Sequence, residues 1–182
     1  LQDLIAEVSP AGKGETFLEL QTSLRSRSES LELGKTNFGL LAVRMAKAIS
    51  AAFGGGVLTN AEGARSEAEL FGKPSSWIDY SGPIKPGKTE GITYFDHRDN
   101  ASFPSKWHVR DDGWMGASIC RDAPVMLFAG RPTTYRYLLH IHAGAVDLER
   151  AQAIAAAFHE RAMLKVEKDP RPHHGSTIRR PG

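Results

Sequence analysis

Several features that would point to a function directly are scarce in this sequence. A single cysteine, Cys120, occurs among 182 residues, which excludes an internal disulfide framework and a cysteine-based zinc cluster. No apolar run approaches the roughly 18 residues that a membrane-spanning helix requires, and the 23 basic and 21 acidic residues are well mixed. We therefore expect neither a nucleic acid nor a membrane as a partner.

The length and the hydrophobic content of 41% suit one domain with a sizeable core. Residues 1–168 are predicted to form this domain, and the basic, Pro- and Gly-rich segment 169–182 is predicted to be a disordered tail. The first residue is Leu1, so we expect the natural start to be missing and any targeting segment to lie upstream. Both a cytoplasmic and an exported location remain open.

Most of the chain reads as short strands separated by Gly, Pro and Ser, which is typical of an antiparallel β-sandwich or barrel. The expected strands are 16–21, 40–45, 57–60, 76–80, 91–95, 124–128 and 134–142. One clear helix follows them. Asp147 is its expected N-cap, and the apolar residues keep a helical period as far as Leu164.

The stretch from Gly91 to Arg110 is rich in side chains that can do chemistry. A strand leads into Asp96 and His97, and after a polar loop come His108 and Arg110. An imidazole that titrates near neutrality suits proton transfer, and a carboxylate beside it can set its tautomer. These residues are candidates for an acid/base site. In the alternative interpretation, Asp96 stabilises a turn and His97 fills a polar corner.

Trp107 lies in the same stretch and is a candidate for stacking on the face of a sugar ring. The alternative is that it belongs to the core, as most tryptophans of a β-sandwich do. Arg110 is a candidate for binding a substrate oxygen, and Glu62 and Asp79 are candidate carboxylates for the same site.

His140 and His142 are two residues apart in an expected strand, so their side chains point to the same face. Such a pair is half of many metal sites in β-barrels. Two aligned histidines are nevertheless few for a metal centre. We favour local hydrogen bonding for them, keep both as weak metal candidates, and predict no metal or other cofactor.

Several spaced motifs, which occur in family order, resemble a bacterial family of PmoA-like proteins labelled "methane oxygenase PmoA". They cover roughly residues 15–165, and the resemblance is to the C-terminal part of that family. The motifs are Asn60-Ala61-Glu62-Gly63, Phe71-Gly72-Lys73, Trp77-Ile78-Asp79-Tyr80-Ser81-Gly82, Gly91-Ile92-Thr93-Tyr94-Phe95-Asp96-His97, Trp107-His108-Val109-Arg110, Tyr135-Arg136-Tyr137 and His142-Ala143-Gly144.

The resemblance implies a galactose-mutarotase-like supersandwich, of which this chain would be a fragment, and a role in bacterial sugar catabolism. If upstream strands are missing, an open sheet edge should favour self-association. The oxygenase label itself is disfavoured, because a membrane subunit of that kind needs several apolar spans.

These observations support three hypotheses about function. The first is a carbohydrate-active protein that performs acid/base chemistry on a sugar or sugar derivative, with His97, His108 and Asp96 as catalytic residues. The second is a sugar-binding module without catalysis, and the third is a metal-dependent oxygenase built on His140 and His142.

Overall fold

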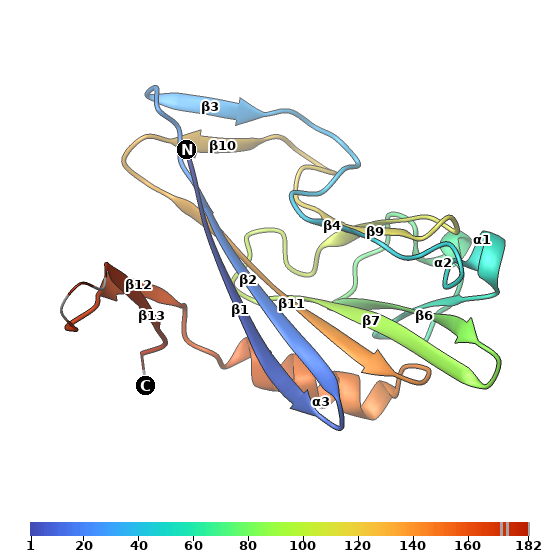
Figure 1. Ribbon diagram of the computed structural model, residues 1–182. Coiled ribbons are helices and arrows are strands. Elements are labelled where there is room, and N and C mark those ends of the chain that lie inside the picture. The colour runs from blue at the N-terminus through green and yellow to red at the C-terminus, as the bar shows by residue number, and fades with distance from the viewer. Residues whose placement is uncertain (172, 174, 182) are drawn as a thin grey trace.

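The computed structural model describes residues 1–171, 173 and 175–181. Its main sheet has six antiparallel strands in the order β1-β2-β11-β7-β6-β5 (Figure 1). The strands are β1 Gln2–Gly12, β2 Glu15–Leu24, β5 Val57–Asn60, β6 Trp77–Lys85, β7 Lys88–Asp96 and β11 Thr133–Ala143. Strands β1 and β5 form the edges of this sheet. Self-association through such an edge stays a prediction.

Smaller elements surround the main sheet. A three-stranded sheet has the order β4-β9-β8, and two ribbons pair β3 with β10 and β12 with β13. These strands are β3 Ser30–Leu33, β4 Ala42–Arg44, β8 Lys106–Val109, β9 Trp114–Ser118, β10 Val125–Phe128, β12 Lys165–Lys168 and β13 Ser176–Arg179, and the short helices are α1 Ala51–Gly54 and α2 Glu67–Leu70.

One face of the main sheet packs against the three-stranded sheet. Strand alternation directs Tyr80, Tyr94 and Tyr137 to this side, where they join the larger apolar core. Trp107 of β8 is fully buried there, and its ring meets Tyr94 edge-on with centroids 4.8 Å apart. Aromatic burial of this kind supplies much of the favourable free energy of a sandwich core.

The opposite face is covered by helix α3, Leu148–His159 (Figure 1). The Asp147 side chain accepts a 3.0 Å hydrogen bond from the Arg150 N–H, so the expected N-cap is confirmed. Ala151, Ala155 and Phe158 form the buried stripe of the helix. They pack on the apolar middle of the sheet, which consists of Trp77, Phe95 and Leu138.

The prediction of a mainly antiparallel β fold with one helix near the C-terminus is confirmed. Its galactose-mutarotase-like character stays a prediction. The helix ends earlier than its apolar period suggested, at His159 rather than Leu164. The reason is local, because the backbone carbonyls of Arg161 and Ala162 turn aside to accept hydrogen bonds from the Arg136 guanidinium.

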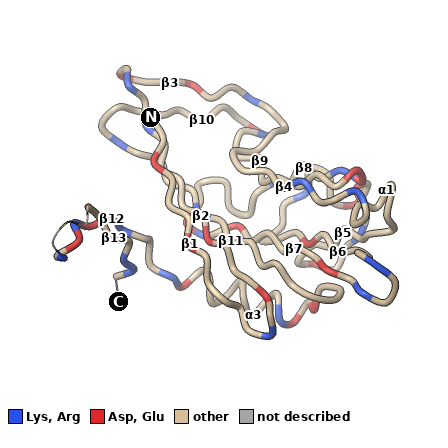
Figure 2. Tube along the Cα trace, viewed as in Figure 1, with Lys and Arg blue, Asp and Glu red and all other residues tan. Residues whose placement is uncertain are grey.

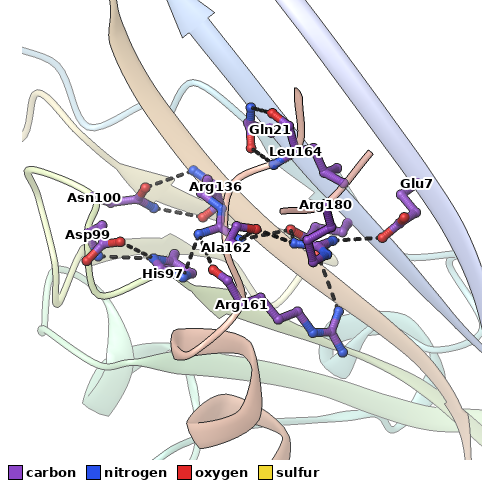
Figure 3. A network of polar contacts seen from close by, with 11 residues as sticks. Glu7, Gln21, His97, Asp99, Asn100, Arg136, Arg161, Ala162, Leu164 and Arg180 are labelled. Carbon is purple, nitrogen blue, oxygen red and sulfur yellow. Dashed lines mark hydrogen bonds and ion pairs between the residues drawn. The ribbon is translucent and has the colours of Figure 1, made fainter. Parts of the chain in front are cut away.

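The segment 169–182 differs from the expected disordered tail where the structure describes it; residues 172, 174 and 182 lie outside the described part. Strand β13 pairs with β12. Arg180 then reaches back to the main sheet and binds Glu7 of β1 at 2.8 Å and Glu19 of β2 at 2.8 Å (Figure 3). Composition alone suggested disorder, but this long-range ion pairing ties the segment to the sheet.

Glu19 is the centre of this polar network. Its carboxylate is almost fully buried and contacts the guanidinium groups of Arg136, Arg161 and Arg180. Burial alone would raise the pKa of Glu19, but hydrogen bonds from the three arginines outweigh it and hold the pKa below its usual value. Only 2% of the Arg136 side chain is exposed. Glu19 therefore compensates a positive charge that is shielded from water.

No helix among the described residues is long and apolar enough to span a membrane. Charges of both signs are spread over most elements of the chain (Figure 2).

Glu19→Gln should destabilise the fold strongly, because it leaves the buried Arg136 charge without its carboxylate. Breaking one partner of a buried ion pair costs about 3–5 kcal/mol. Glu7→Gln is the matched control, because Glu7 is a partly exposed partner of Arg180 and such pairs contribute about 1 kcal/mol or less. Urea unfolding measures both free energies. Equal losses in the two variants would contradict this assignment.

Candidate functional site

The residues expected to form one acid/base site lie on two sides of the main sheet. His97 is on the helix side, where its ring contacts Phe158 with centroids 4.8 Å apart, and the Asp96 carboxylate lies at the end of β7 beside the Ser105 N–H. His108 is on β8 in the smaller sheet, where its ring contacts Phe38 at 4.9 Å and Phe71 at 5.3 Å. The structure therefore does not bring His97 and His108 together.

Asp96 and His97 have structural partners. Asp96 accepts hydrogen bonds from Asn100 Nδ2 at 2.7 Å and from the Ser105 N–H at 2.9 Å, while burial raises its pKa to about 6. His97 Nδ1 accepts a bond from the Asp99 N–H at 3.1 Å. Burial, helped by the nearby Arg136 charge, lowers the pKa of His97 to about 4. Both residues are fully buried, and this arrangement matches the turn-stabilising alternative.

The remaining candidates of that stretch are dispersed. Trp107 belongs to the core and donates from Nε1 to the Ser75 carbonyl at 2.9 Å. Arg110 pairs at 2.9 Å with Glu67 near the surface. Glu62 is exposed. Burial, together with the Arg110 charge, lowers the pKa of His108.

A different group of polar side chains does assemble, at the end of the main sheet beside the N-terminus of α3. His140 and His142 of β11 lie on the helix side with ring centroids 5.2 Å apart. They line a pocket of about 360 Å³, a size at the small end of ligand sites. The other lining residues are Lys13, Glu15, Thr93, Ala143, Ala145, Val146, Asp147, Arg150, Ala151 and Ile154.

His142 is bonded to the buried carboxylate of Asp79. Its Nε2 lies 2.8 Å from Asp79 Oδ1. The same carboxylate accepts hydrogen bonds from Thr93 Oγ1 at 2.8 Å and from Ser81 Oγ. Since an ionised carboxylate only accepts hydrogen bonds, the proton sits on Nε2 of His142. Burial opposes charging of the ring, but the bond to Asp79 and its negative charge outweigh it and raise the pKa of His142.

His140 is bonded to a second carboxylate, Glu15 of β2. Its Nε2 lies 2.9 Å from Glu15 Oε2. Glu15 also accepts hydrogen bonds from the two terminal guanidinium nitrogens of Arg150, Nη1 and Nη2, and from the Ala143 N–H. The Arg150 hydrogen bond is the main reason that the pKa of Glu15 falls to about 2. The hydrogen bond to Glu15 would raise the pKa of His140. Burial and the neighbouring His142 charge outweigh that bond and lower the pKa of His140.

Gly91 of β7 makes room for the His142 ring. Gly91 lies between His142 and Ser81, because it pairs with both residues in the sheet. The His142 imidazole therefore passes over Gly91 to reach Asp79 in β6. A Cβ atom at this position would lie 2.8 Å from His142 Cε1 and would also meet Ser81 Oγ. The absence of a side chain at residue 91 is therefore a condition for the His142–Asp79 contact.

Two neighbouring imidazoles with pKa values shifted in opposite directions suit acid/base chemistry. Compared with an ordinary imidazole, the surroundings of His142 favour the protonated form and those of His140 the neutral form, which is the pattern that separates a general acid from a general base. Among the described residues, no group of three or more His, Cys, Asp or Glu side chains is placed to hold a metal ion.

A comparison with protein families matches residues 3–156 to one family model, described as a family of unknown function. The chain belongs to that family, DUF6807. The resemblance to PmoA-like proteins is thereby corrected, because the DUF6807 model is the one that matches. No curated protein and no solved structure matches this DUF6807 chain.

Asp79→Asn should lower the pKa of His142, because an amide supplies neither the negative charge nor the ionic hydrogen bond that now raises it. The Cε1–Hε1 signal of His142, followed by NMR against pH, measures this value. Glu62→Gln is the control, since Glu62 is exposed and lies outside the pocket lining. An unchanged His142 pKa in Asp79→Asn would disprove the pairing.

The same pairing predicts a pH-dependent stability. Because the folded-state pKa of His142 lies above its ordinary value of 6.5, its protonation stabilises the fold below that pH. The contribution disappears as the pH rises through the folded pKa. The loss of unfolding free energy in Asp79→Asn, measured in urea, should therefore be larger at about pH 6 than at about pH 9. In Glu62→Gln the loss should be the same at both pH values.

Gly91→Ala should displace the His142 ring from Asp79, because the added methyl group occupies the space of the imidazole. We expect a loss of about 1–3 kcal/mol, as for other overpacked interiors, and a fall in the His142 pKa towards its usual value. Gly87→Ala is a control for replacing a glycine, because a Cβ atom there meets nothing within 4 Å and only its φ of +72° is strained. It should destabilise the protein without changing the His142 pKa.

Proposed function

We propose that this protein binds a small polyhydroxylated molecule, a sugar or sugar derivative, in the pocket between the main sheet and α3, and that His140 and His142 transfer protons to and from it. The observation that supports this proposal most is that two imidazoles lie 5.2 Å apart in one pocket, each hydrogen-bonded to its own buried carboxylate, with pKa values shifted in opposite directions. Titratable groups with shifted pKa values in a cleft are typical of functional sites.

The two histidines have distinct roles in this proposal. His140 is the base, because its neutral ring keeps a lone pair on Nδ1 while Nε2–H donates to Glu15. His142 is the acid, and Asp79 stabilises its protonated form. Arg150 compensates the charge of Glu15, so the carboxylate fixes the His140 tautomer without raising the pKa of that ring above its usual value.

The chemical nature of the pocket supports a hydroxyl-rich ligand. Its sheet side offers hydrogen-bonding groups from both histidines and Thr93, and its helix side offers the apolar surface of Ala151 and Ile154. A few polar groups that fix orientation, set against an apolar wall, are the usual composition of a small-molecule site.

The test is an NMR titration of the histidine Cε1–Hε1 signals with a panel of D-hexoses, D-pentoses, aldonic acids and uronic acids. At least one class should shift the His140 and His142 signals, and His142→Gln should weaken its binding by about tenfold, or roughly 1.4 kcal/mol. His108→Gln is the matched control, because His108 lies in the other sheet. If no compound shifts either pocket signal, the proposal is wrong. Binding without any turnover identifies a sugar-binding module and excludes the catalytic role.

A further inference from the structure

The acid and the base of the proposed site stand on one side of the pocket. In strand β11, His140 pairs with Thr93 and His142 with Gly91, so the two imidazoles project from alternate positions on the same face. Their carboxylate partners belong to the same sheet, Glu15 in β2 and Asp79 in β6. The main sheet therefore contributes both imidazoles and both carboxylates from one direction.

The helix side of the pocket carries two charged residues, Arg150 and Asp147, and both take part in hydrogen bonds of their own. Arg150 is paired with Glu15. Asp147 is engaged as the N-cap of α3. The third charged lining residue, Lys13, belongs to the turn between β1 and β2 of the main sheet and not to the helix side. The remainder of the helix side is Ala145, Val146, Ala151 and Ile154.

We infer, on the basis of the function proposed above, that proton transfer in this pocket is confined to one face of the substrate, and that the substrate class is an α-hydroxy carbonyl compound undergoing a 1,2-hydrogen shift. Inversion at a carbon removes a proton on one face and returns it on the other, so it needs an acid and a base on opposite faces. A base and an acid on a single face return the proton to the face it left.

The hydrogen shift balances with the groups present. His140 takes the proton from the carbon that bears the hydroxyl group, the C–H electron pair becomes the second bond of a C=C, and the carbonyl oxygen takes a proton from His142. The product of this half is an enediol. In the second half, His140 returns its proton to the former carbonyl carbon while His142 recovers a proton from the other hydroxyl, which becomes the new carbonyl. No oxidant, reductant or cofactor is consumed.

The experiment incubates the protein in D₂O with D-glucose, D-xylose, D-fructose, D-ribose and DL-glyceraldehyde, followed by ¹H and ¹³C NMR. We expect aldose–ketose interconversion with one compound or more, with deuterium in only one of the two hydrogen positions at carbon 1 of the ketose. His140→Gln should slow this exchange at least 100-fold, as expected for loss of a general base. His108→Gln should leave the rate unchanged.

Glu15→Gln provides a second variant if His140→Gln fails to fold. It keeps both imidazoles and should slow the exchange at least tenfold and shift its pH profile, because the partner that sets the His140 tautomer is lost. A variant that merely loosened the fold would leave the pH profile of the remaining activity in place.

Three results would overturn the inference. The first is inversion at carbon 2 without formation of a ketose, and the second is equal labelling of both hydrogen positions at carbon 1. Either result shows proton transfer on two faces of the substrate. The proposed acid/base function would still hold in both cases. Absence of exchange with the whole panel removes the hydroxy carbonyl class. The histidine titration described above then decides independently whether the pocket binds a ligand.

Discussion

The structure depends on the pairing of charges that strand β11 carries under helix α3. Alternation along this strand directs Arg136, Leu138, His140 and His142 to the helix side. A buried cation or imidazole is costly unless a partner compensates it. Glu19 compensates Arg136, and Glu15 and Asp79 compensate the two histidines. The apolar patch around Leu138 separates these two polar regions, and α3 packs on this patch through Ala151, Ala155 and Phe158.

The two polar regions differ in whether their side chains have hydrogen-bonding atoms that face a pocket. At one end, the Arg136 guanidinium is occupied by a carboxylate and by two backbone carbonyls near the end of α3. That end consequently fixes where the helix stops and where the C-terminal segment attaches. At the other end, each histidine uses one ring nitrogen for its carboxylate and faces a pocket. Similar buried charge pairs thus hold a helix end and a C-terminal segment in one place, and leave two imidazoles beside a pocket in the other.

The sequence predicts the elements better than the site. Strand spacing and the Asp147 cap are local signals, and they locate β2, β7, β11 and α3 closely. The expected site does not assemble, because residues that are close along the chain lie on different sides of the main sheet. His97 and His108 lie on opposite sides of the main sheet, His97 against α3 and His108 in the smaller sheet. The spacing of His140 and His142 did indicate one face, but Glu15 lies 125 residues from His140, and only the order of the strands brings them together.

The location of the pocket follows from the same pairing. Helix α3 has small residues, Ala151 and Ala155, where it crosses the apolar middle of the sheet, so it packs closely there. Towards its N-terminus, Arg150 extends to Glu15 instead of packing on an apolar neighbour. A long charged side chain that pairs with a carboxylate needs space that a methyl group does not. The Arg150 side chain, which pairs with Glu15, thus occupies space between the helix and the sheet at the pocket that holds the two imidazoles.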